Sequence, residues 1–311
     1  MIILIVFALV RAIKKPRALA KVPGFAIAFF GNTMERIVDG ILYESKPANF
    51  VKLKAYLTKT GHQEFVAHRP LVWSEVCKID YSVSEPEPRT DEDELSRSAR
   101  NAARAASRAK TRVRHACKEI GADTLLTLTY RSNQTDLALA KVHLKEFARR
   151  MYRVIPGWVA VAGFELQNRG AVHVHLATQR LAPSFVRVDK GAVVRVKSYE
   201  LIRRIWRSVT KEHGGNIDVK ARKRGSSRSV ARIASYISKY FTKAFSDGEK
   251  WSNRWTKFGS IPSTPRVDLG TFPTMFDCIQ ECFRLCDQNL SIVTTYSRRD
   301  DSFVFMLEPP R

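Results

Sequence analysis

The residues from Trp158 to Arg180 form the most constraining pattern in the sequence, because they read as two strands joined by a tight turn. The first half, WVAVAGFEL, is apolar, and the second, AVHVHLAT, alternates with the period of two that is typical of a strand. Between the halves, residues 168–170 read Asn-Arg-Gly, with glycine where a three-residue turn needs a positive φ angle. We therefore predict a β-hairpin centred on Arg169.

This turn predicts which side chains share a face of the hairpin. Centring on Arg169 places Glu165 opposite His173, and strand alternation puts His175 on the same face. One carboxylate and two imidazoles suit Mg²⁺ or Mn²⁺ acting on a phosphate, although Zn²⁺ would also bind. The alternative interpretation is that both histidines are ordinary surface residues of a strand.

The surrounding residues predict a β-α-β-β-α-β order. We expect a strand over 124–132, a helix over 135–152, the hairpin, a basic loop, a helix over 199–214 and a strand over 216–223. This order is the split plan of ferredoxin-like and RNA-recognition folds. The predicted class is α+β, with an antiparallel sheet that has helices on one face and leaves the other face open to a ligand.

A second stretch that can carry chemistry lies at 226–248, SSRSVARIASYISKYFTKAFSDG, and its apolar stripe predicts an amphipathic helix. Tyr236 and Tyr240 lie four residues apart at the polar margin of that stripe, beside Arg232, Lys239 and Lys243. Taken alone, such a tyrosine pair indicates packing. A tyrosine hydroxyl next to cations can also attack a phosphodiester and form a reversible protein-DNA ester.

Three segments together resemble the HUH endonuclease superfamily: LLTLTY (125–130), GAVHVHLA (170–177) and YISKYFTK (236–243) follow the order and separation of its motifs I, II and III. The spacing of the tyrosines is similar to that in two-tyrosine rolling-circle replication initiators of the microvirus gene A and filamentous-phage gene II type. The resemblance implies the following roles: metal ligands His173 and His175 with Glu165 as our candidate third ligand, nucleophiles Tyr236 and Tyr240, an adjacent Lys239, and a structural part for Thr127 and Thr129.

The same resemblance implies an activity and its partners. We expect site-specific nicking and rejoining of a single DNA strand at a replication origin, through a 5′-phosphotyrosine intermediate and with Mg²⁺ or Mn²⁺. The expected partners are single-stranded or supercoiled origin DNA and a host polymerase and helicase, in the cytoplasm of a bacterial cell. Two alternatives remain open, namely a transposase or relaxase of the same superfamily, and a non-catalytic basic protein that coats single-stranded nucleic acid.

The charge of the chain favours a polyanionic partner. Lys and Arg number 53 against 30 Asp and Glu, which gives a net charge of +23. An anionic membrane is the rival partner, but residues 1–10 are too short an apolar run to span a bilayer, and we expect no stable insertion. Our candidate DNA contacts are Arg104, Arg108, Arg131, Arg169, Arg232 and Lys243.

The pattern along the chain predicts four parts. Residues 1–90 form an amino-terminal segment of unknown role that ends in an acidic, Pro-containing linker, and 91–121 form a basic helix with little apolar face. That helix is either a solvated surface or a contact that tracks a nucleic-acid backbone. The nickase domain follows at 122–260. In the carboxy-terminal segment, 261–311, we expect two short strands after a helix with Cys278, Cys282 and Cys286 on its buried face.

Overall fold

The protein is described by a computed structural model for residues 35–38, 41–78, 91–189, 191–221, 230, 233–234, 236–237, 255–286, 291–297 and 302–309. Two compact units result, one from residues 1–47 and 72–80, the other from 48–71 and 81–311. The first unit contains a sheet of three strands in the order β1 (Glu35–Val38), β2 (Ile41–Pro47) and β5 (Leu71–Lys78). No helix among the described residues is both long and apolar enough to cross a membrane.

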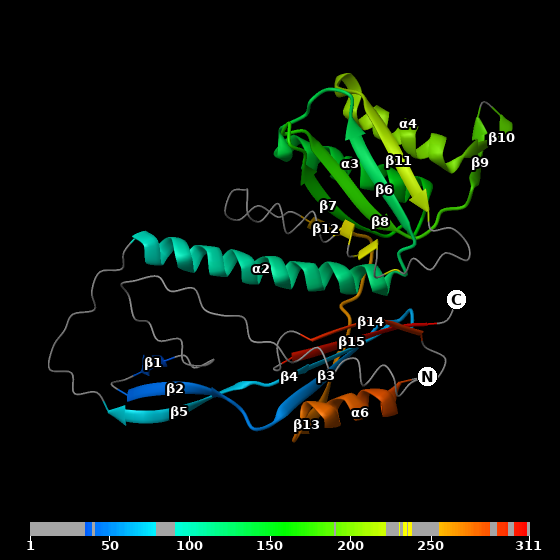
Figure 1. Cartoon of the computed structure of the whole chain (residues 1–311). Coiled ribbons are helices and arrows are strands. Elements are labelled where there is room, and N and C mark those ends of the chain that lie inside the picture. The colour runs from blue at the N-terminus through cyan, green and yellow to red at the C-terminus, as the bar shows by residue number, and fades with distance from the viewer. Residues whose placement is uncertain are drawn as a thin grey trace. The chain divides into compact units, whose positions relative to one another are not determined.

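The second unit contains the sheet that carries the predicted hairpin (Figure 1). Its five strands, all antiparallel to their neighbours, lie in the order β11 (Gly215–Ala221), β6 (Thr124–Tyr130), β8 (Val172–Thr178), β7 (Ala160–Leu166) and β12 (Trp255–Phe258). With α3 (Leu137–Val154) and α4 (Ser198–Thr210), the chain order of this domain is the predicted β-α-β-β-α-β. The α+β class is confirmed.

Two segments of this domain differ from the expectation. The predicted basic loop between β8 and α4 contains a two-stranded hairpin of β9 (Ser184–Asp189) and β10 (Ala192–Lys197). Part of the aromatic and basic segment after 250 is a strand, β12, which pairs with β7. Phe258 stacks on Trp158 with ring centroids 6.3 Å apart, so this aromatic residue closes the core.

Helices α3 and α4 cover one face of the sheet, as Figure 1 shows. Asp136 caps α3 by accepting hydrogen bonds from the backbone amides of Ala138 and Leu139. Trp206 of α4 is fully buried, meets Phe147 edge-on, and donates a hydrogen bond from Nε1 to the carbonyl of Thr129 at 2.8 Å. This core fixes the strands from behind and leaves their other face for the residues of interest.

The opposite face is only partly open, which corrects two expectations. Helix α2 (Asp91–Glu119) begins within the stretch that we read as a linker, and its acidic first turn suits the positive end of a helix. The helix was expected to have little apolar face, yet its second half packs on the sheet in a buried cluster with the helical residues Val230, Ala234 and Ile237. Alanines contribute here as packing surface, and not only as helix formers.

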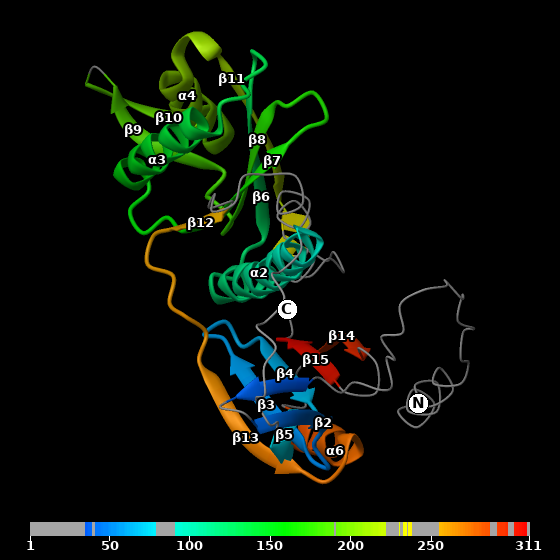
Figure 2. The same cartoon turned by 90° about the vertical axis from the view of Figure 1, so that its left-hand side faces the viewer.

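The two ends of the chain contribute to one further sheet of the second unit (Figure 2). Its order is β13 (Arg266–Phe272), β3 (Val51–Leu57), β4 (Gln63–His68), β15 (Ser302–Glu308) and β14 (Ser291–Ser297). Helix α6 (Met275–Leu285) packs on it through Cys278 and Cys282, which are buried as predicted, while Cys286 is half-buried at the helix end. The segments before 90 and after 261 therefore share a core, which sequence analysis treated as separate parts.

Candidate functional site

The hairpin has the predicted register. Glu165 of β7 pairs with His173 of β8, and the turn between them contains Gly170 at a φ of +81°. The amide of Gly170 donates a hydrogen bond to the carbonyl of Gln167, and the amide of Gln167 donates to the carbonyl of Ala171. A glycine is required there because the left-handed region is strained for other residues. The local sequence thus aligns the two strands.

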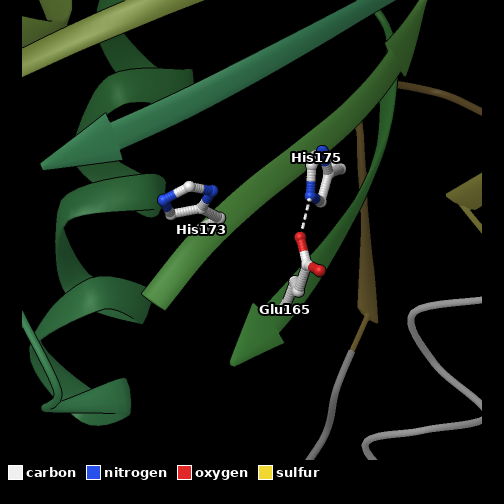
Figure 3. Close-up of side chains that lie close together, drawn as sticks. All are labelled: Glu165, His173 and His175. Atoms are coloured by element: carbon white, nitrogen blue, oxygen red, sulfur yellow. Dashed lines mark hydrogen bonds and ion pairs between the residues drawn. The ribbon is translucent and has the colours of Figure 1, made fainter. Parts of the chain in front are cut away.

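Glu165, His173 and His175 converge on one patch of the sheet (Figure 3). The carboxylate Oε2 of Glu165 lies 2.7 Å from Nε2 of His175, which is the contact drawn as a dashed line. One possible ligand atom from each of the three side chains lies within 4.8 Å of the other two. This is the one such group of three or more His, Cys, Asp or Glu side chains in the described part of the chain.

The environment of the cluster favours neutral imidazoles. Burial lowers the pKa of His175, and the hydrogen bond and charge of Glu165 act in the opposite direction. Burial also lowers the pKa of His173, and the neighbouring His175 lowers it further. A neutral imidazole is the form that can coordinate a metal ion.

Two neighbours orient the imidazoles, and the sequence did not point to them in that role. Thr127 of β6 pairs with His175 across the sheet and its Oγ1 lies 3.1 Å from Nδ1 of that ring. The side-chain amide of Gln167 lies 3.3 Å from Nδ1 of His173. Thr127 was expected to be structural, as part of motif I. The pairing of β6 with β8 is what brings its hydroxyl to the ring.

Tyr236 lies against this cluster. Its ring meets the ring of His175 edge-on, at 90°, with centroids 6.1 Å apart. The side chain is 42% exposed, whereas its helical neighbours Ala234 and Ile237 are fully buried. The predicted position at the margin of an apolar stripe is therefore confirmed for this tyrosine. Tyr240, Lys239, Arg232 and Lys243 lie outside the described residues.

The remaining candidate DNA contacts lie in two places. Arg131, directly after β6, and Arg169, in the hairpin turn, are both exposed. Arg169 is close enough to His173 to lower the pKa of that imidazole. Arg104 and Arg108 are exposed on α2 and belong to no cluster with the histidines.

One basic residue near the site was not anticipated. Lys220 of β11 forms an ion pair with Asp218 at 3.0 Å, and Asp218 pairs in register with Thr127. The positive charge of Lys220 lowers the pKa of His175, which places that charge close to the cluster. The sequence shows both residues on a strand, but only the pairing of β11 with β6 places them beside the histidines.

The comparison with known families bears on this part of the chain. Residues 123–245 match the model of the replication-associated protein ORF2 family. The match supports a replication initiator protein. It covers less than half of the 311 residues but includes β6, the hairpin and the tyrosine-bearing segment. No match was found among curated proteins or among solved structures. A replication-associated family also suggests that the chain binds DNA.

Proposed function

We propose that this replication initiator nicks and rejoins one strand of origin DNA through a phosphotyrosine intermediate, with a divalent ion held by Glu165, His173 and His175. The observation that carries the proposal is the position of Tyr236, whose exposed ring lies against His175 at the edge of the cluster. A nucleophile and a set of metal ligands on one patch of sheet are what phosphoryl transfer to a tyrosine requires.

The three ligands fit Mg²⁺ or Mn²⁺. Around an octahedral ion with bonds of about 2.1 Å, neighbouring donor atoms lie about 3 Å apart. The 2.7 Å between Glu165 and His175 is close to that value, and the ligand atom of His173 lies within 4.8 Å, a separation that a side-chain rotation can shorten. Mixed nitrogen and oxygen donors, without thiolate, are suited to phosphate chemistry.

The chain's own residues supply the other parts of the reaction. When bound, the ion would polarise the phosphate oxygens of the scissile bond. The Tyr236 phenol loses its proton and attacks the phosphorus, the bond to the 3′ oxygen breaks, and that oxygen leaves as a hydroxyl. The new ester resembles the bond it replaces, so the 3′ hydroxyl can reverse the step. We assign Tyr240 the second transfer and Lys239 the stabilisation of the phosphate charge.

A covalent adduct is the direct test of this function. We expect the full chain, incubated with Mn²⁺ and overlapping single-stranded oligonucleotides that cover its replicon, to give one DNA-linked band on a denaturing gel. Replacing both tyrosines, Tyr236→Phe with Tyr240→Phe, should remove the band. Tyr199→Phe is the matched control, since Tyr199 lies on α4 and is similarly exposed at 40%. An adduct that survives the double replacement would exclude the proposed nucleophiles.

Thr127 provides a second prediction at the same site. If Nε2 of His175 is the ligand atom, Nδ1 keeps the proton and donates it to the Thr127 hydroxyl. Thr127→Val removes that acceptor while it keeps the side-chain shape, and we expect Mn²⁺ affinity to fall by about 10- to 100-fold. Thr127→Ser should retain most of the affinity. Calorimetric titration with Mn²⁺ measures both variants, and equal affinities for Val and Ser would rule out this role.

A further inference from the structure

Five arginines form a stripe along helix α2, and we propose that this stripe binds the phosphate backbone of duplex DNA beside the nicking site. The stripe consists of Arg97, Arg100, Arg104, Arg108 and Arg112. All five are exposed. The proposal concerns binding alone, so it does not depend on the nicking chemistry.

The stripe lies opposite the face by which α2 is anchored. At 3.6 residues per turn, the five arginines fall within an arc of about 120°. The buried positions lie about half a turn of the helix away and include Val113, Ala116 and Cys117, each no more than 3% exposed. The arginines therefore point away from the core on a helix whose second half is fixed in place.

The stripe lacks countercharge within the described part of the protein. No Asp or Glu occurs in the sequence between Glu94 and Glu119, and no ion pair joins any stripe arginine to a described carboxylate. From Arg100 to Arg112 the arginines are four residues apart, a spacing at which like charges destabilise a helix. Such an arrangement is favourable when an external polyanion supplies the negative charge.

The shape and composition of the stripe indicate a duplex. From Arg97 to Arg112 the helix rises about 22 Å, which matches about six base pairs at 3.4 Å each. Surfaces that bind single strands combine cations with aromatic rings on which bases stack. Helix α2 contains no Phe, Tyr or Trp. A surface of cations without stacking partners suits phosphates whose bases are already paired, and the replication-associated match makes the duplex DNA.

The test measures binding of the full chain to a duplex of arbitrary sequence, about 30 base pairs long, over a range of salt concentrations. Replacing the five arginines with glutamine should make the slope of log affinity against log salt shallower by about four to five, because each lost phosphate contact removes about 0.9. Replacing them with lysine should preserve the slope, since lysine also binds phosphate.

A charge-matched control separates the stripe from general attraction. The control replaces five exposed cations elsewhere in the second unit with glutamine: Lys145, Arg153, Arg195, Arg204 and Lys211. We expect a much smaller change in slope for this variant. An equal change would overturn the proposal, as would an effect of the stripe variant confined to oligo(dT) or to an RNA duplex. Adduct formation on a short single strand should be unchanged in the stripe variant, so failure here and failure of nicking give different results.

Discussion

Replacing His175 with alanine is expected to remove Mn²⁺ binding and to reduce formation of the DNA adduct by at least about a hundredfold. His175 is the central residue of the cluster. It contacts the carboxylate of Glu165 at 2.7 Å, the hydroxyl of Thr127 at 3.1 Å and the ring of Tyr236. Loss of the imidazole therefore removes a ligand and releases the groups that surround it. Even the loss of a residue that only orients a ligand costs about 10- to 100-fold in metal affinity.

Two measurements distinguish this effect from misfolding. Mn²⁺ titration and adduct yield are compared for His175→Ala, for His175→Asn, which keeps a polar side chain, and for His213→Ala. His213 is a histidine of the same domain that belongs to no ligand cluster among the described residues. The His213 variant should behave like the unmodified protein, and the thermal transition without metal should be similar in all three variants. Metal-dependent adduct formation that persists in both His175 variants would show that the cluster is not the metal site.

The core of the candidate site was predictable because its parts are close in sequence. Glu165 and His175 are ten residues apart, and one turn with a glycine at its end sets their register. The alternation of a strand then does the rest. The position of Tyr236 was predictable for a similar reason, since the spacing of apolar residues on a helix shows which positions lie at the margin.

Residues that reach the site through strand pairing were not predictable in the same way. Thr127 and His175 are 48 residues apart, and their contact depends on how β6 pairs with β8. A shift of one residue in that pairing would turn Thr127 to the opposite face. Lys220 depends in addition on the pairing of β11 with β6. Such registers are set by tertiary packing, which no local pattern records.

The same limit explains the terminal segments. Strands β3 and β4 lie before residue 70, whereas β13, β14 and β15 lie after residue 265, and all five belong to one sheet. Their apolar residues were visible in the sequence as isolated patches. Nothing local indicates that patches about two hundred residues apart bury one another. The second half of α2 was misjudged for a related reason, since its small residues become buried only once the sheet is present.

Replacing Glu64 with glutamine is expected to have the largest effect on stability. Glu64 lies on β4 and is only 2% exposed. Arg114 donates to it through Nη2 at 2.5 Å and Nε at 3.1 Å, and Lys118 Nζ and His115 Nε2 each lie 3.4 Å away. All three partners belong to the last turns of α2, so this carboxylate joins the helix to the second sheet.

The neutral amide leaves buried positive charge without compensation. Breaking a buried ion pair by removing one partner costs about 3–5 kcal/mol, because the remaining charge stays desolvated. We expect the Glu64→Gln variant to lose that amount in the free energy of unfolding, measured by denaturation in urea. Glu146→Gln is the matched control. Glu146 also accepts hydrogen bonds from two arginines, Arg149 and Arg150, but on the exposed surface of α3, where water screens the pair and the loss should be small.

The stabilisation by Glu64 should also depend on pH with a definite sign. Burial alone would raise the pKa of this carboxyl, but the hydrogen bond from His115 and the charges of Arg114 and Lys118 outweigh burial and hold the pKa far below its usual 4.5. A group whose pKa is lower in the folded state stabilises the fold above its unfolded value and loses that contribution as the pH falls. The difference in stability between the unmodified protein and Glu64→Gln should therefore be complete above about pH 5 and shrink progressively below pH 4.5. A difference that stays constant down to about pH 2.5, or that is no larger than for Glu146→Gln, would show that the ionised carboxylate does not hold α2 on this sheet.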